Sequence, residues 1–131
     1  MKIKTHETID QTLCGTPIEV EKGCSQVELR TTRAMAADTT GLVHGGFLFG
    51  LADYAAMLAV NHPNVVLGSA EVRFLKPVEV GDKVLARAQV EEVQGKKQAV
   101  VVSVMKSDET VFQGRFTCFA LDKHVLASSK A

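Results

Sequence analysis

The stretch that decides the fold is residues 38–61, which read DTTGLVHGGFLFGLADYAAMLAVN. Within residues 45–60 only Asp53 and Tyr54 carry polar side-chain groups, so the pattern predicts a helix that is mostly buried. A carboxylate in a buried helix is costly unless it is paired, neutralised or used in chemistry. The helix begins after His44 with two glycines, where a backbone can approach a ligand closely. A histidine, bare N–H groups at a helix start and a half-buried carboxylate together indicate a site that handles a carbonyl group.

Short strands are predicted on both sides of this helix. Pro63 disfavours helical geometry at the residue before it, so the helix ends near Asn61. Apolar runs separated by turn residues then predict four strands, at residues 65–74, 83–93, 97–106 and 110–121. The valine-rich strand at 97–106 is expected to be central and buried on both faces.

The N-terminal part of the chain is predicted to add a helix, a hairpin and a loop. Thr5 is the expected N-cap of a short helix over residues 5–13. Alternation of apolar and polar residues around Gly23 predicts a hairpin with one solvated face. The predicted segments of this region are the hairpin strands 18–21 and 26–31 and the loop 31–43.

Four consecutive strands with short turns predict an antiparallel meander, because parallel strands would need long crossover connections. Five or six strands can bury one long apolar helix only if the sheet curls around it. The predicted fold class is therefore α+β, with a long central helix wrapped by a curved antiparallel sheet. We expect a single domain over residues 1–131, in which residues 1–25 form an N-terminal extension and residues 122–131 a frayed tail.

The composition argues against several classes of protein. Of 131 residues 46% are hydrophobic, and 15 Lys and Arg balance 15 Asp and Glu, which argues against disorder and against a nucleic-acid-binding surface. No apolar run reaches the ~20 residues of a membrane span, and the N-terminus lacks the apolar core of a secretory signal. Cys14, Cys24 and Cys118 are odd in number and lack C-x-x-C spacing, which indicates reduced thiols of a cytoplasmic protein. We expect neither a metal nor a cofactor.

The helix start and a segment downstream of it together resemble a known family. A His-Gly-Gly sequence begins at His44, Asp53 follows nine residues after that histidine, and residues 73–82 read RFLKPVEVGD. This combination resembles the hotdog-fold acyl-CoA thioesterases, and within them the PaaI-like subgroup, over roughly residues 26–120. The resemblance implies a hotdog fold and a thioester hydrolase. Its substrate would be an acyl- or aryl-acyl thioester of coenzyme A, bound between two subunits.

The resemblance also implies roles for the residues of the site. The backbone N–H of Gly45 would hold the carbonyl oxygen, Asp53 would be the nucleophile or general base, and His44 would orient the site. The family often has Asn six residues before the histidine, where this chain has Asp38. A second carboxylate there could raise the pKa of its neighbour by repulsion, or it could face away. The candidate substrate-binding residues are Gly46, Asp38 and Thr39.

Each of these residues also has a purely structural interpretation. Asp53 could be a structural acid bonded to neighbouring strands, and the two glycines could serve only close packing of the helix. His44 could only cap the helix, while Asp38 and Thr39 could be loop residues. His6, His62 and His124 are interpreted as surface residues, since their spacing suggests no metal site.

The spacing between His44 and Asp53 indicates a partner subunit. Nine helical positions advance by ~13.5 Å and turn the side chain in steps of ~100° to the opposite face. One chain therefore cannot direct both residues at one carbonyl, whereas two copies packed side by side can. We expect a homodimer, and beyond it a homotetramer built as a dimer of dimers, because a small curved sheet leaves its edge strands unpaired.

Two other functions stay open. From Arg73 to Phe116 the sequence also resembles the hotdog domain of FapR-type regulators, which bind malonyl-CoA without hydrolysing it. The chain would then be a non-hydrolytic acyl-CoA sensor. A hotdog dehydratase or hydratase is the second alternative, and it would need an additional pair of a histidine and an acid, which the sequence does not make evident.

Overall fold

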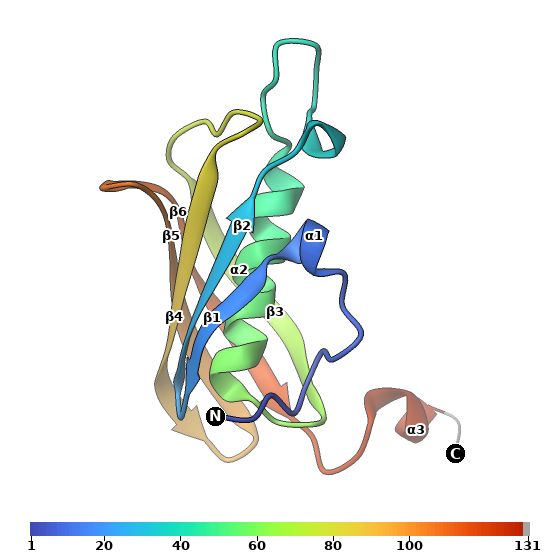
Figure 1. Cartoon of the computed structure of the whole chain (residues 1–131). Coiled ribbons are helices and arrows are strands. Elements are labelled where there is room, and N and C mark those ends of the chain that lie inside the picture. The colour runs from blue at the N-terminus through green and yellow to red at the C-terminus, as the bar shows by residue number, and fades with distance from the viewer. Residues whose placement is uncertain (130–131) are drawn as a thin grey trace.

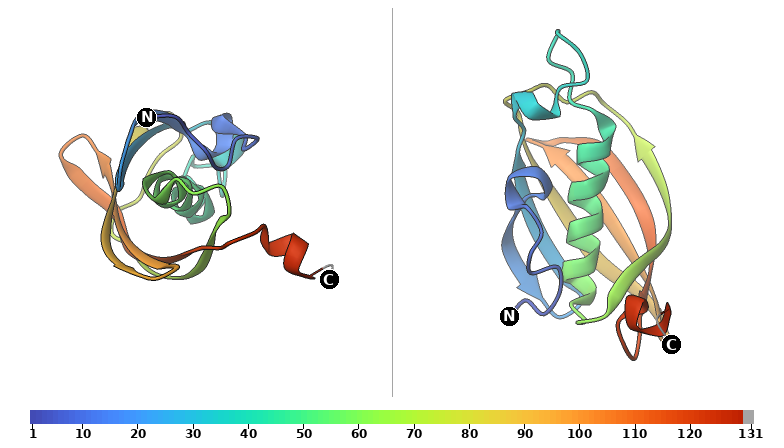
Figure 2. Two further views of the ribbon diagram at one scale, coloured as in Figure 1. Left: turned by 90° about the horizontal axis from the view of Figure 1, so that it is seen from below. Right: turned by 90° about the vertical axis from the view of Figure 1, so that its right-hand side faces the viewer.

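Helix α2 (Gly45–Val60) forms the axis of the molecule, and one six-stranded antiparallel sheet curls around it (Figure 1). The computed structural model describes residues 1–129. Viewed along the helix, the strands curve around α2 and leave part of its surface to other segments (Figure 2). The predicted α+β hotdog fold, with a long central helix and a curved antiparallel sheet, is confirmed.

The strands of the sheet follow the order β1-β2-β4-β5-β6-β3, so that β1 and β3 are its two edges. The strands are β1 (Thr16–Glu21), β2 (Cys24–Arg30), β3 (Val65–Phe74), β4 (Lys83–Gln94), β5 (Lys97–Lys106) and β6 (Glu109–Ala120). The predicted bounds of β3 and β5 are correct, and those of β4 and β6 differ by one residue at their ends. Both hairpin strands begin two residues earlier than predicted, so β1 and the start of β2 lie within the predicted N-terminal extension.

Helix α2 is buried because its side chains are apolar on nearly every side. Ala52, Ala55 and Ala56 are fully buried, and their small side chains let the strands approach the helix axis. The hydroxyl of Ser25 in β2 donates a hydrogen bond to the Ala55 carbonyl oxygen at 2.7 Å. The helix ends at Asn61, which adopts a left-handed conformation with φ 48°. Within residues 1–129 no helix is long and apolar enough to cross a membrane.

The predicted helix over residues 5–13 is wrong. Helix α1 spans only Gln11–Cys14, and its N-cap is Asp10, whose carboxylate accepts from the Thr12 N–H at 2.9 Å. Thr5 is buried instead of capping a helix. Tertiary contacts of residues 1–9 outweigh their local helix propensity. We call residues 1–9 the N-terminal strap.

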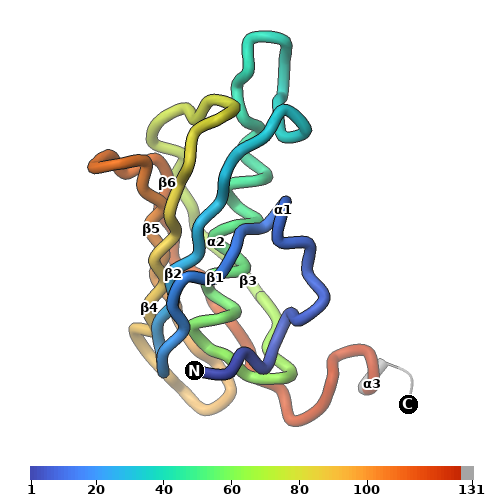
Figure 3. The backbone as a smooth tube through the Cα atoms, viewed as in Figure 1, coloured from blue at the N-terminus to red at the C-terminus, as the bar shows by residue number. Residues whose placement is uncertain are grey.

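The N-terminal strap passes the C-terminal end of α2 and then runs up beside it to α1 (Figure 3). The Asn61 side chain forms hydrogen bonds with two residues of the strap. Its Oδ1 accepts from the Lys4 N–H at 2.8 Å, and its Nδ2 donates to the Lys2 carbonyl oxygen at 2.8 Å. Ile3 and Ile9 pack against the core. The strap therefore covers a part of α2 that the sheet leaves open.

Two further predictions differ from the structure. Strand β5 is buried on one face only: Val100 and Val102 are buried, whereas Val101 between them is 39% exposed. The reason is that one chain supplies a single sheet with the helix on one side of it. Part of the predicted frayed tail forms a short helix, α3 (Val125–Ser129), and residues 130–131 of that tail lie outside the described residues. The predicted loop 31–43 contains one 3-10 turn, η1 (Arg33–Met35).

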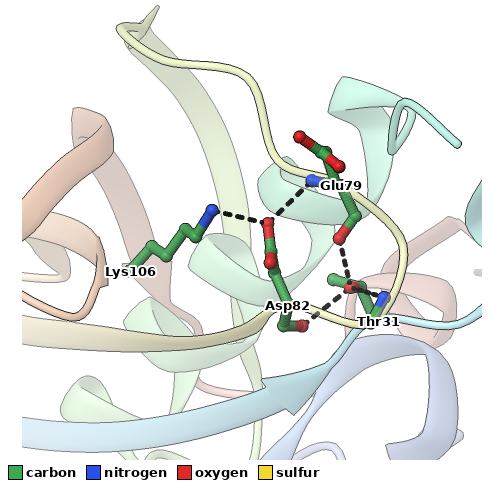
Figure 4. A network of polar contacts seen from close by, with 5 residues as sticks. Thr31, Glu79, Asp82 and Lys106 are labelled. Carbon is green, nitrogen blue, oxygen red and sulfur yellow. Dashed lines mark hydrogen bonds and ion pairs between the residues drawn. The ribbon is translucent and has the colours of Figure 1, made fainter.

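A polar network holds the turn at the end of the RFLKPVEVGD segment (Figure 4). Thr31 Oγ1 lies 3.0 Å from the Glu79 carbonyl oxygen and 2.7 Å from that of Asp82, and it accepts from the Gly81 N–H at 3.1 Å. The Asp82 carboxylate accepts from the Glu79 N–H at 2.8 Å and forms an ion pair with Lys106 at 3.0 Å. The turn is thereby fixed to the ends of β2 and β5.

The same turn supports the residues that lead into α2. The Val43 N–H donates to the Val78 carbonyl oxygen, and the Val80 N–H donates to the Gly41 carbonyl oxygen, both at 2.8 Å. The His44 N–H donates to the Met35 carbonyl oxygen at 2.9 Å. Two segments that are far apart in sequence therefore set the position at which α2 begins.

Candidate active site

The start of α2 presents an unpaired backbone donor. His44 is the N-cap, and its ring Nδ1 accepts from the Gly46 N–H at 2.9 Å. The Phe47 N–H donates to the His44 carbonyl oxygen at 3.1 Å. Across residues 1–129 no acceptor is paired with the Gly45 N–H. This donor lies at the positive end of the helix dipole, where it can bind a carbonyl oxygen that gains negative charge.

A shallow apolar cavity of about 340 Å³ lies in front of Gly45. It is lined by residues 42–43 of the preceding loop, by Leu48 and by residues 74–78, which follow β3. The ring of Phe74 lies so close to Gly45 that a Cβ atom there would be 2.9 Å from Phe74 Cε1. Phe74 is 55% exposed, although it also packs edge-on against Phe112. The absence of a side chain at Gly45 therefore serves close contact with this ring.

Asp53 lies two turns further along α2, in a different cavity. Its side chain is half-buried, and Oδ1 is a buried oxygen without a hydrogen-bond partner among the described residues. Burial raises the pKa of Asp53 from 3.8 to about 6. Its cavity has a volume of about 360 Å³ and is lined by apolar side chains at the start of β3, among them Val65 and Leu67. A carboxylate in this state can accept a proton near neutral pH.

The structure does not bring Gly45 and Asp53 together within one chain. Eight residues of helix separate them, which corresponds to about 12 Å along the axis. The Gly45 cavity touches Phe74 at the end of β3, whereas the Asp53 cavity touches Val65 at its start. The two halves of the expected site thus lie at opposite ends of one edge strand.

Asp38 and Thr39 lie in an exposed loop that is closed by an antiparallel bridge between Ala36 and Val43. Asp38 Oδ1 accepts from the Thr40 N–H at 3.0 Å and from the Thr40 hydroxyl at 2.7 Å. These bonds lower the pKa of Asp38, the hydroxyl contact first. The raised pKa of Asp53 comes from burial and owes nothing to Asp38 within the chain. Asp38 is therefore occupied with shaping its own loop.

Two residues of the N-terminal strap line the Asp53 cavity, and neither was predicted to lie at the site. Thr5 is buried, and His6 is half-buried instead of lying on the surface. Nothing in the sequence points to them, because they are far from Asp53 along the chain.

Cysteine and metal chemistry have no support in this region. Burial raises the pKa of Cys118 to about 12, so its thiol stays protonated and is a poor nucleophile. In the part of the chain that the structure describes, no three His, Cys, Asp or Glu side chains are placed to hold a metal ion.

Comparison with known proteins connects this geometry to a family. Residues 40–113, more than half of the chain, match the thioesterase superfamily. The chain is 54% identical over 123 residues to the methylthioribose-1-phosphate isomerase of Aquifex aeolicus, covering 93% of this chain but 27% of that protein. It is 29% identical over 126 residues to the transcription factor FapR of Caldanaerobacter subterraneus, covering 95% of this chain and 62% of that protein. The chain thus spans only part of both curated relatives.

Solved structures agree with the sequence match. The uncharacterized protein PH1136 of Pyrococcus horikoshii is 55% identical and superimposes with a TM-score of 0.95, covering 96% of this chain and 97% of that one. A mutant of the phenylacetic acid degradation protein PaaI of Thermus thermophilus is 28% identical, with a TM-score of 0.78. That comparison covers 85% of this chain and 96% of that one.

Proposed function

Because this chain belongs to the thioesterase superfamily, we propose that it hydrolyses an acyl- or aryl-acyl thioester of coenzyme A. The proposal rests on the environment of the Asp53 carboxylate. Asp53 borders a cavity lined by both polar and apolar side chains, has a carboxylate oxygen without a partner among the described residues, and has a pKa of about 6. Such a carboxylate is ionised at neutral pH yet basic enough to take a proton from water.

The proposed site lies between two subunits. Strand β3 pairs only with β6, so its outer edge is free to pair with another strand. If two β3 edges pair antiparallel about a twofold axis, the start of one strand lies beside the end of the other. The Asp53 cavity of one subunit then adjoins the Gly45 cavity of its partner. The exposed Phe74 and Leu75 would become buried in this arrangement, which favours it further.

In this site the thioester carbonyl oxygen accepts a hydrogen bond from the Gly45 N–H. Ionised Asp53 of the other subunit either removes a proton from a water molecule that attacks the carbonyl carbon, or attacks that carbon itself. In both cases the C–S bond then breaks, and the thiolate of coenzyme A leaves and is protonated. In the second case water afterwards hydrolyses the mixed anhydride and frees Asp53. His44 fixes the Gly46 N–H through Nδ1, which leaves its Nε2 free to contact the substrate. Asp38 and Thr39 would shape the loop beside the entrance.

A panel of acyl- and aryl-CoA thioesters, with released thiol detected by a disulfide reagent, tests the activity. The parent should release thiol from at least one class of thioester. Asp53→Asn keeps size and hydrogen bonding but cannot act as base or nucleophile, so we expect kcat to fall by about 10²–10⁴-fold with acyl-CoA binding retained. Full activity in folded Asp53→Asn would refute the mechanism, and no release from any thioester would refute the activity.

The similarity to FapR over 95% of this chain favours one alternative, a protein that binds acyl-CoA without hydrolysing it. In that case an intact thioester should be recovered by mass spectrometry from the purified protein after prolonged incubation. The proposed hydrolase should instead yield free acid and free thiol. Assembly into tetramers and a cytoplasmic location stay predictions.

A further inference from the structure

The N-terminal strap brings His6 to the cavity that holds Asp53. The strap is fixed at Asn61 by two hydrogen bonds, from the Lys4 N–H and to the Lys2 carbonyl oxygen. It then buries Thr5, which is 4% exposed although it is polar. The contacts of the residues that precede His6 in the chain therefore hold His6 in place.

His6 has an unusual backbone conformation for a residue with a side chain. Its φ is 52°, in the left-handed region, which residues other than glycine adopt infrequently. Such conformations persist only where the surrounding structure determines them, and they cluster at functional sites. The conformation is accompanied by ring contacts: the imidazole lies 6.5 Å from the Tyr54 ring, tilted by 39°.

The hydrogen bonding of the ring leaves one nitrogen available. Thr5 Oγ1 lies 2.7 Å from His6 Nδ1. With the ring proton on Nδ1 and donated to that oxygen, Nε2 is left as an acceptor. Burial lowers the pKa of His6, which favours a neutral imidazole. Asp53 lines the same cavity as His6, and its buried Oδ1 has no partner across residues 1–129.

We infer that His6 is a further catalytic residue of the site, one that holds the attacking water together with Asp53. The inference rests on the proposed thioesterase function. The water donates one hydrogen to the Asp53 carboxylate and the other to His6 Nε2, so that its lone pair is directed at the thioester carbon. As the C–O bond forms, Asp53 takes the first proton. When the C–S bond breaks, that proton passes to the thiolate, and the second ionises from the new acid into solvent. Thr5 is a positioning residue, since its hydroxyl contacts His6 Nδ1 and holds the ring.

Four variants of the full chain test this inference. His6→Phe keeps a ring beside Tyr54 but removes both nitrogens, and we expect kcat to fall by about 10²-fold with KM changed less than threefold. His6→Gln keeps an acceptor and should recover part of that loss. Thr5→Val keeps the shape of the side chain but removes the hydroxyl that contacts His6 Nδ1, and it should lower kcat severalfold with KM nearly unchanged. Thr8→Val, at an exposed position of the same strap, is the matched control and should keep the parental kcat.

The outcomes separate this inference from the proposed function. Loss of kcat in His6→Phe with partial recovery in His6→Gln, at unchanged thermal unfolding, supports the role of His6. Parental kcat in folded His6→Phe, while Asp53→Asn is inactive, overturns the role of His6 and leaves the hydrolase intact. Equal losses in His6→Phe and His6→Gln with a lowered melting temperature would assign His6 a purely structural role. A parent without thiol release would overturn both proposals.

Discussion

The carboxylate of Asp53 combines two properties that a structural acid would lack. One of its oxygens is buried without a partner among the described residues, and burial alone raises its pKa to about 6. A buried acid without compensation destabilises the fold when it is ionised, which is a cost that functional sites commonly carry. The cavity beside it has polar lining residues, among them Thr5 and His6, as well as apolar ones, so it can hold a water molecule or part of a substrate.

The raised pKa of Asp53 predicts how the free energy of unfolding depends on pH. In the unfolded chain Asp53 titrates near its ordinary pKa of 3.8, and in the folded chain near 6. Between these values the folded state holds more protons, so Asp53 makes stability fall as the pH rises from about 4 to about 6. Asp53→Asn should therefore stabilise the protein by about 1–3 kcal/mol at pH 8 and much less at pH 4. Urea unfolding at one protein concentration measures this difference. The exposed Asp108→Asn is the control, and a gain for Asp53→Asn that does not depend on pH would contradict the prediction.

The start of helix α2 depends on segments that are distant from it in the sequence. The His44 ring caps the Gly46 N–H, the Phe74 ring covers Gly45, and the turn around Asp82 holds the loop before the helix. The RFLKPVEVGD segment therefore supports the end of the helix at which the Gly45 N–H is unpaired among the described residues.

A pair of substitutions at Gly45 isolates its N–H. Any Cβ at this position approaches the Phe74 ring, whether the new residue is Ala or Pro. Pro suits the first position of a helix, and His44 already has the extended geometry, φ −64° and ψ 133°, that precedes a proline. Only Gly45→Pro removes the donor, so its kcat should be about 10²–10³-fold below that of Gly45→Ala. Equal kcat values in the two folded variants, measured with the best thioester of the panel, would remove this N–H from the mechanism.

The edge strand β3 runs between the two cavities of the proposed site. The Asp53 cavity borders its start and the Gly45 cavity its end. A twofold axis at this edge would create two complete sites from two incomplete ones. A monomer of this fold would lack a complete site at any concentration, so activity and association should be inseparable.

Mixed dimers test the shared site directly. Asp53→Asn and Gly45→Pro chains, each inactive alone, are unfolded together and refolded. Random pairing makes about half of the dimers mixed, and each mixed dimer holds one site with both groups intact, as symmetry requires. Activity should therefore recover to about a quarter of the parental value. Light scattering should show at least a dimer, and mass spectrometry should confirm mixing. Background activity in confirmed mixed dimers would place both groups in one chain and refute the shared site.

The central helix, most strand positions and the wrapped α+β architecture could be predicted from the amino-acid sequence alone. These follow from hydrophobic periodicity and turn residues, which act over a few positions of the chain. The spacing of His44 and Asp53 also determined that both cannot face one carbonyl, since helix geometry is fixed. Asp53 stood out as an acid within an apolar helix, and the roles of Gly45 and Asp53 were implied by the resemblance to hotdog-fold thioesterases.

The polar groups that share a cavity and the faces that are covered could not be predicted in this way, because they depend on how the chain folds in three dimensions. Thr5 was expected to cap a helix and is instead buried in the strap, while His6 was expected at the surface and lines the Asp53 cavity. The valines of β5 look alike in sequence, yet Val101 is exposed because one chain supplies a single layer. Such contacts join residues far apart along the chain. Their free energy depends on the complete packing of the molecule, which no local pattern of residues encodes.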